Sequence, residues 1–298
     1  MNPGGERNAC LTGEFVWAYR GRTFAVGYDQ RGQGRPVLLL PALSTISTRD
    51  EWKAVAEALA DEFTITTVDW PGFGARPHPR AHYDQDLLLA FLVAFVRSRF
   101  ADPVAVAAAG HAAGFALRAA ARGLLAWSRL SLVAPTWRGP LPSAMGEHPR
   151  TYALLRVLVA APGLGHMLYR LNAGDWFLRW MTTRHVYADP TRITPAMLAE
   201  KQAVARQRGA RFAAAAFVTG ALDPFPDRGS CLAALRGLRA PVQLFRGDHT
   251  PPRSRQEMLA LGDAVARGPV TLPGALALHE ESAPALIGPL RSFLCESA

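Results

Sequence analysis

The sequence contains little cysteine, and its three cysteines, Cys10, Cys231 and Cys295, lie far apart in the chain. An odd number of scattered cysteines argues against a disulfide framework and indicates a reducing compartment, so we expect a cytoplasmic protein. Long hydrophobic runs are also missing, since the longest, residues 87–96, is too short to cross a membrane. Residues 1–10 are polar and Gly-rich, unlike a secretory signal. We therefore predict no membrane span.

Lysine is nearly missing as well, because only Lys53 and Lys201 are present. The formal net charge of +9 therefore comes almost wholly from arginine. The arginines are spread singly, without a basic run or a nucleic-acid-binding motif, so no nucleic-acid partner is expected. A general compositional bias explains this charge best. An Arg-rich surface that binds a partner or an anionic membrane is the alternative.

The sequence also lacks the patterns that hold common cofactors. No G-x-G-x-x-G or Walker pattern follows a predicted strand, so no nucleotide cofactor is expected. No pair of His, Cys, Asp or Glu residues has the spacing and context of a zinc site, so no metal is expected either.

The most informative stretch present is residues 104–123. An apolar run, 104–109, predicts a strand that ends at Gly110, and small residues from about Gly114 to Gly123 predict a helix. The turn between them, Gly-His-Ala-Ala-Gly at 110–114, has the spacing of the G-x-S-x-G nucleophile elbow, with Ala112 in place of serine. We therefore expect the strained residue of an elbow at Ala112.

Strand and helix patterns alternate along most of the chain. An opening hairpin is predicted at 15–19 and 23–28, and buried strands at 36–41, 63–68, 130–137 and 240–247. Helices are predicted at 50–61, 84–99, 254–266 and 283–294. This alternation predicts an α/β fold with a mostly parallel, doubly wound sheet. From residue 138 to 222 only helical patterns recur, rich in Trp, Tyr, Phe and Met.

Two motifs carry a resemblance to a known superfamily. The stretch 69–74, Asp-Trp-Pro-Gly-Phe-Gly, resembles the D-x-P-G-x-G turn of α/β-hydrolases, and the elbow at 110–114 follows it in the right order. The resemblance covers residues 15–294 and implies the α/β-hydrolase fold. It implies a core at 1–137 and 223–298 and an inserted helical cap, or lid, at 138–222. The stretches 136–140, 168–172, 184–187 and 218–224 further resemble hydrolase-like proteins of photosynthetic bacteria and plastids, which carry alanine in the elbow.

The resemblance also shows where the catalytic residues depart from the superfamily pattern. The acid usually follows in a G-x-x-D pattern, where this chain has Thr250 and places Asp248 two residues earlier. The usual histidine position holds Ala275, with His279 four residues later. A serine hydrolase needs a hydroxyl, an imidazole and a carboxylate together, so ordinary serine hydrolase activity is not expected. The candidate catalytic residues that remain are His111, His279 and Asp248.

The favoured hypothesis is a protein without the Ser-His-Asp triad that binds or transforms an apolar small molecule in a capped pocket. The candidate substrate-binding residues are Leu43, Ser44, Thr45, Trp70, His111, Ala112, Thr136, Trp137, His185, Tyr187 and Asp223. A histidine could act there as a general base without a nucleophile. Two alternatives stay open: a carboxylic-ester hydrolase whose elbow serine has been replaced by Ala112, and a non-catalytic scaffold or assembly protein.

Overall fold

Eight strands form one sheet in the part of the chain that a computed structural model describes, residues 10–146, 148–172 and 174–296. The strands are β1 (Leu11–Tyr19), β2 (Arg22–Arg31), β3 (Arg35–Leu40), β4 (Phe63–Val68), β5 (Val104–Ala109), β6 (Trp127–Val133), β7 (Val242–Gly247) and β8 (Val270–Leu272). Their order is β1-β2-β4-β3-β5-β6-β7-β8. The β1–β2 and β2–β4 pairs are antiparallel and the other pairs are parallel. The predicted mostly parallel sheet is confirmed.

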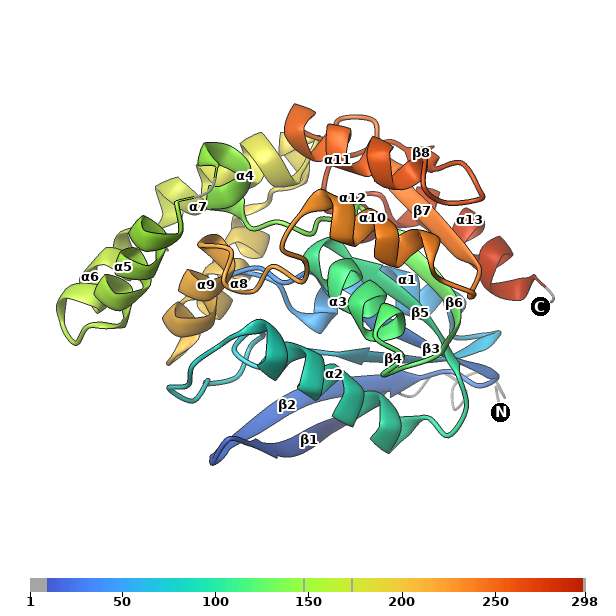
Figure 1. Cartoon of the computed structure of the whole chain (residues 1–298), viewed down its shortest axis with the longest axis horizontal. Coiled ribbons are helices and arrows are strands. Elements are labelled where there is room, and N and C mark those ends of the chain that lie inside the picture. Colours follow the sequence, from blue (N-terminus) through green and yellow to red (C-terminus); the bar gives the residue numbers. More distant parts are fainter. Residues whose placement is uncertain (1–9, 147, 173, 297–298) are drawn as a thin grey trace.

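Helices cover both faces of this sheet (Figure 1). They are α1 (Lys53–Leu59), α2 (Gln85–Arg99), α3 (Gly110–Ala121), α10 (Arg228–Arg236), α11 (Pro252–Gly262), α12 (Leu278–Glu281) and α13 (Ala283–Cys295), with the short 3-10 turn η1 (Arg49–Trp52) before α1. Successive side chains of a strand point to opposite faces. Leu38 and Leu40 of β3 therefore pack with α2, α3 and α10, whereas Val37 and Leu39 pack with α1 and α13.

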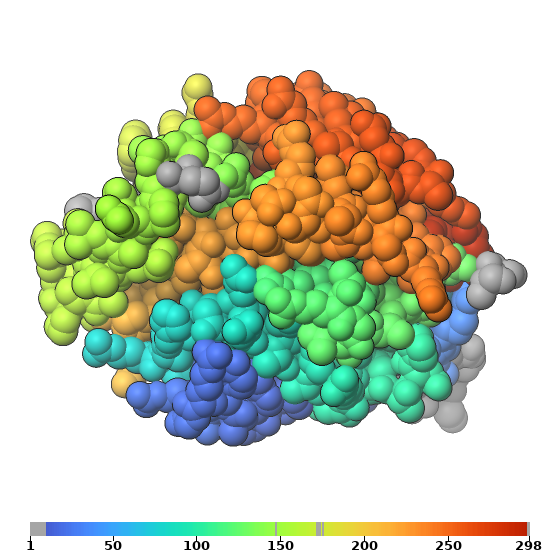
Figure 2. All heavy atoms as spheres, viewed as in Figure 1, coloured from blue at the N-terminus to red at the C-terminus, as the bar shows by residue number. Residues whose placement is uncertain are grey.

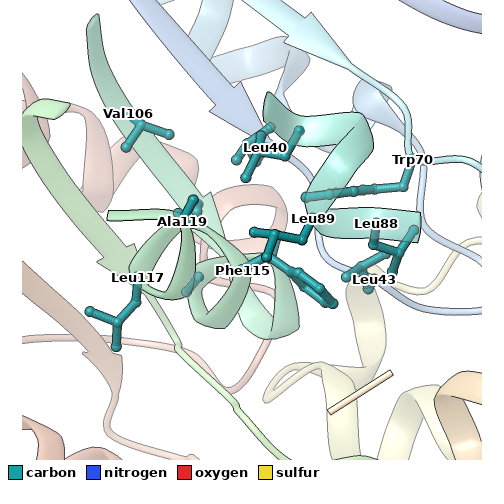
Figure 3. Packing of buried hydrophobic residues seen from close by; sticks show 14 of the residues in the cluster. Leu40, Leu43, Trp70, Leu88, Leu89, Val106, Phe115, Leu117 and Ala119 are labelled. Carbon is teal, nitrogen blue, oxygen red and sulfur yellow. The ribbon is translucent and has the colours of Figure 1, made fainter. Parts of the chain in front are cut away.

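Aromatic rings fill the core between the sheet and α2 and α3. The rings of Trp70 and Phe115 lie 5.7 Å apart, and Figure 3 shows them beside Leu43 and Leu88. The indole N–H of Trp70 donates to the backbone oxygen of Pro41 at 3.1 Å. Leu43 and Trp70 are both about 1% exposed. These two residues, predicted to touch substrate, are part of the hydrophobic core.

The helical stretch predicted after β6 is present. It contains α4 (Pro140–Met145), α5 (Pro149–Ala160), α6 (Leu164–Asn172), α7 (Asp175–Met181), the π-helical turn η2 (Thr182–Val186), the 3-10 turn η3 (Pro190–Arg192), α8 (Pro195–Ala205) and α9 (Ala210–Val218). No described residue of this stretch is in a strand. Figure 1 shows α5 and α6 at the end of the molecule farthest from α13. The division into core and cap stays a prediction.

Helix lengths limit how the chain could meet a membrane. Within the described residues, no single helix is both long and apolar enough to cross one. Helix α5 together with Leu164–Arg170 of α6 reaches that length and composition only as a pair bent by 104°.

Candidate functional site

The elbow lies two residues earlier than predicted. Strand β5 ends at Ala109 and α3 begins at Gly110, which has a left-handed φ of +52°. The only described non-glycine residues with positive φ are Arg20 and Ala134, so Ala112 is not the strained residue. Only glycine adopts this φ without a steric penalty on a Cβ atom, which explains the glycine at the turn itself. Ala112 lies instead in the first turn of α3, fully buried in the hydrophobic core.

The missing side chain of Gly110 would point toward the loop after β3. A Cβ atom built on Gly110 would lie 3.3 Å from the Cβ of Ala42, with the Cα of Ala42 at 3.9 Å. The backbone oxygen of Gly110 accepts a hydrogen bond from the backbone N–H of Thr136 at 3.0 Å. The point of the turn thus faces a methyl group and carries no hydroxyl or thiol, so it offers no nucleophile for acyl transfer.

His111 follows the elbow glycine and is fully enclosed. Its Nε2 donates to the backbone oxygen of Leu222 at 3.0 Å, and the Asp223 Oδ1 lies 3.5 Å from the same nitrogen. Burial lowers the pKa of His111 to about 4, although the bond to Leu222 opposes this shift. Its Nδ1 has no hydrogen-bond partner among the described residues. His111 is therefore neutral at pH 7.

Asp223 joins the two ends of the helical stretch at this histidine. Its Oδ1 accepts a hydrogen bond from the backbone N–H of Gly139 at 2.7 Å, just before α4. Asp223 itself follows α9, beside Leu222. The contacts around His111 thus hold the start and the end of the helical stretch against α3, which is a positioning role for both side chains.

Asp248 lies at the surface after β7. Its Oδ1 lies 2.6 Å from the Nδ1 of His249 and accepts the backbone N–H of Gly274 at 2.9 Å. Thr250, at the position expected for the acid, is buried and donates its hydroxyl to the backbone oxygen of Gly247 at 2.8 Å. These contacts order the loops after β7 and β8. They do not bring Asp248 to His111 or His279.

His279 belongs to a second, charged group of side chains. Its Nε2 donates to the Glu51 Oε2 at 3.1 Å. The Lys201 Nζ lies 3.7 Å from the Glu51 Oε1 and 3.0 Å from the Glu280 Oε2, which also accepts the Tyr187 hydroxyl at 2.6 Å. Glu51, Tyr187, Lys201, Glu280 and His279 are called the Glu51 cluster below. All but the partly exposed Glu280 are buried, so the cluster joins η1, α8 and α12 inside the protein.

Glu51 stays ionised at the centre of this cluster. Burial alone would raise the pKa of Glu51, but the hydrogen bond from His279 and the charge of Lys201 outweigh burial and hold it below the ordinary value. The Ser47 hydroxyl also hydrogen-bonds Glu51 and lies 2.7 Å from the Ser44 hydroxyl. The carboxylate thus stands between the hydroxyl and the imidazole. A serine relay needs the imidazole in the middle, so this order cannot activate Ser47 through His279.

Three other predicted residues have separate surroundings. Trp137 is buried and its indole N–H donates to Glu257 at 3.1 Å. Thr45 is half-buried on the loop after β3. His185 is exposed, with its ring 5.7 Å from that of Trp180. Among the described residues, no three His, Cys, Asp or Glu side chains converge as a metal site requires.

One hollow lies on the helical stretch. It is a groove of about 410 Å³ between α7, the residues that join η3 to α8, and α8 itself, and it is lined by Trp176, Arg179, Ile193, Thr194, Pro195, Leu198, Ala199 and Gln202. Leu198 packs with Ile46 of the loop after β3, and Ile193 packs with Ala277 before α12. A second hollow, beside Trp70, measures only about 10 Å³. Neither hollow is lined by Gly110 or Ala112, where the pocket was predicted.

Residues 37–286 match the Alpha/beta hydrolase family, and the chain therefore belongs to this family.

Its structure is similar to that of wild-type Cfl2 from Burkholderia cenocepacia, with a TM-score of 0.72, 23% identity, and coverage of 95% of this chain and 96% of the other. It is also similar to a malate-bound thermophilic esterase from Thermogutta terrifontis, with a TM-score of 0.73 and 19% identity over 95% and 98% of the two chains. The enol-lactonase from Burkholderia xenovorans LB400 gives a TM-score of 0.70 at 18% identity over 94% and 100%. At these identities the likeness shows the fold alone. No curated protein matches the sequence significantly.

Proposed function

We propose that this protein binds an apolar small molecule in the groove between α7 and α8 and does not hydrolyse esters through a nucleophile on the elbow. The position of the elbow is the observation that supports the absence of ester hydrolysis. Its left-handed residue is Gly110, whose Cβ position faces the methyl group of Ala42. An acyl-enzyme intermediate needs a reactive side chain at that point, and glycine supplies none.

The size and lining of the groove support the binding of an apolar small molecule. Its volume of about 410 Å³ falls within the size range of ligand pockets, roughly 300–1,000 Å³. Trp176, Ile193 and Leu198 supply apolar surface for a hydrocarbon or ring system. Arg179 is the only charged side chain among the described residues that line the groove, so an acidic end of the ligand would pair there.

The contacts of His279 speak against an esterase with a replaced serine. That alternative requires His279 within hydrogen-bond reach of a hydroxyl at position 112. Ala112 is enclosed in the hydrophobic core, whereas the imidazole of His279 contacts Glu51 and the Trp52 ring, 4.8 Å away. We therefore expect neither Ala112→Ser nor Gly110→Ser to produce an esterase.

Binding and catalysis are tested separately on the full chain. The fluorescent probe N-phenyl-1-naphthylamine should bind the protein, and Ala199→Trp should weaken its binding at least tenfold by filling the groove. Ala203→Trp is the matched control, because Ala203 is exposed on the same helix and does not line the groove. Equal probe affinity in wild type and Ala199→Trp would contradict the binding site. Turnover of p-nitrophenyl esters by the wild type, or by either serine variant, would contradict the proposal on catalysis.

A further inference from the structure

Exposed apolar side chains gather at one end of the molecule. Among the described residues, eleven large apolar side chains are exposed, and seven of them lie on α5, α6 and α7. These seven are called the apolar face: Leu154, Val157, Leu158, Leu164, Met167, Trp176 and Trp180. Figure 2 shows the yellow-green atoms of α5 and α6 forming the surface at one end of the molecule. Exposed apolar side chains that are concentrated on neighbouring helices indicate an interaction surface, whereas single exposed apolar residues are normal.

Beyond its first turn, α5 is inverted relative to an ordinary surface helix. Leu154, Val157 and Leu158 are three and four residues apart, so they share one side of the helix, and they are 59%, 65% and 37% exposed. Arg156 instead donates to the Thr219 hydroxyl at 3.0 Å, and partial burial lowers the pKa of its guanidinium. A helix facing water shows the opposite arrangement, with its charges outward. The outer side of α5 therefore suits an apolar surrounding.

The charges on α5 and α6 have one sign. From Pro149 to Asn172 the sequence contains three arginines and neither aspartate nor glutamate. Arg150 and Arg170 are exposed, as is Arg179 on α7. Arginines beside a layer of leucine, methionine and tryptophan are complementary to a surface with anionic head groups above hydrocarbon. Tryptophan is enriched at that boundary, which favours a lipid surface over an acidic protein.

We propose that α5, α6 and α7 dock this protein on the surface of a membrane that contains anionic lipid. Leu154, Val157 and Met167 enter the boundary between head groups and acyl chains, while Arg150 and Arg170 contact the head groups. The 104° bend between α5 and α6 makes this a peripheral contact that does not span the bilayer. Trp176 and Arg179 of α7 also line the proposed groove, but the five residues named here do not, so variants of these five test the membrane contact separately from the groove.

Vesicle flotation of the full chain tests this proposal. The wild type should float with vesicles of phosphatidylcholine and phosphatidylglycerol, and more weakly with phosphatidylcholine alone. Leu154→Ser/Val157→Ser/Met167→Ser should lower the bound fraction at least tenfold. The matched control is Leu11→Ser/Val16→Ser, which changes residues of β1 that are 65% and 61% exposed, and it should bind like the wild type.

The arginines give a second variant that leaves the apolar side chains in place. Arg150→Gln/Arg170→Gln should remove most of the preference for phosphatidylglycerol, and added salt should weaken wild-type binding. Circular dichroism checks that each variant is folded, and the arginine pair decides the question if the serine variant does not fold. Failure of the wild type to float, or equal flotation of wild type and both variants, would overturn the proposal. So would self-association through the same residues without vesicle binding, measured by gel filtration.

Discussion

The elbow at Gly110 and the Glu51 cluster both contact the chain that follows β3, but they are built from opposite kinds of residue. Around the elbow the backbone has a strand-to-helix turn, and the facing side chain, Ala42, is a methyl group. In the Glu51 cluster, carboxylates, an amine, an imidazole and a phenol are packed together, and Ser47 lies beside them.

The difference shows that backbone geometry and reactive groups are separate properties of this fold. A catalytic site needs both at one place, because the nucleophile must touch its base. Here the turn lacks the groups, and the groups are assembled with the carboxylate between hydroxyl and imidazole. The elbow therefore contributes a backbone turn without a reactive group. The Glu51 cluster holds η1, α8 and α12 together through charge.

The largest expected loss of stability comes from a substitution in the Glu51 cluster. Glu51→Gln removes the central carboxylate and leaves buried Lys201 and His279 without its charge, so the free energy of unfolding should fall by about 3 kcal/mol. Urea denaturation at pH 7 measures this change. The control is Glu57→Gln, because Glu57 is half exposed and pairs with Arg31, and it should cost less than about 1 kcal/mol. Similar losses in the two variants would mean that the Glu51 cluster does not hold the helices.

The next effect concerns His111 and depends on pH. Its pKa in the folded protein is about 4, below the ordinary 6.5, so the unfolded chain binds a proton between these values while the folded chain does not. This contribution to stability is complete above pH 6.5 and is lost as pH falls toward 4. Each pH unit within the window costs at most about 1.4 kcal/mol, and the step from pH 7 to 5 costs about 2 kcal/mol.

Denaturation of the wild type and of His111→Asn at both pH values tests this prediction. The variant should lose about 2 kcal/mol less than the wild type on going from pH 7 to pH 5. His82→Asn is the control, because the His82 side chain is 85% exposed, and its pH dependence should match that of the wild type. Identical pH profiles in all three proteins would show that His111 is not held neutral.

The smallest effect concerns the elbow backbone. Gly110→Ala forces a Cβ atom into a left-handed conformation and should cost about 1 kcal/mol. Gly123→Ala is the matched control, because Gly123 has a φ of +65° and nothing within 4 Å of its Cβ position. If crowding by Ala42 adds to the strain, the loss at Gly110 exceeds that at Gly123. A stabilised Gly110→Ala variant would show that the turn does not need glycine.

The order of strands and helices could be predicted from the sequence because each element has its own local pattern. The run 104–109 predicts β5 with the bounds that the structure shows, and Gly123 has the left-handed φ expected after a helix. Asp84 caps α2 by accepting the N–H of Leu87 at 2.8 Å, in agreement with a helix predicted from residue 84. The β1–β2 hairpin and the helical stretch after β6 were also predictable in this way.

The elbow and the Glu51 cluster were not predicted correctly, for different reasons. The G-x-x-x-G spacing placed the strained residue at Ala112 and the helix start near Gly114, whereas the turn follows the strand directly at Gly110. The end of the apolar run was the better signal. The Glu51 cluster joins positions 51, 187, 201, 280 and 279, which no local pattern relates. The only sign of it was the rarity of lysine, since Lys201 is one of two in the chain.

The helical stretch separates two paired strands of the sheet in the sequence, and this separation affects the order in which the protein folds. Strand β6 ends at Val133, and its parallel neighbour β7 begins only at Val242. Contacts between segments so distant in sequence form slowly, because the long intervening chain must be closed before pairing stabilises it. During synthesis, β6 emerges from the ribosome long before β7 and leaves an unpaired edge. We expect the attachment of β7 and β8 to be a late step, and β6 to need protection until then.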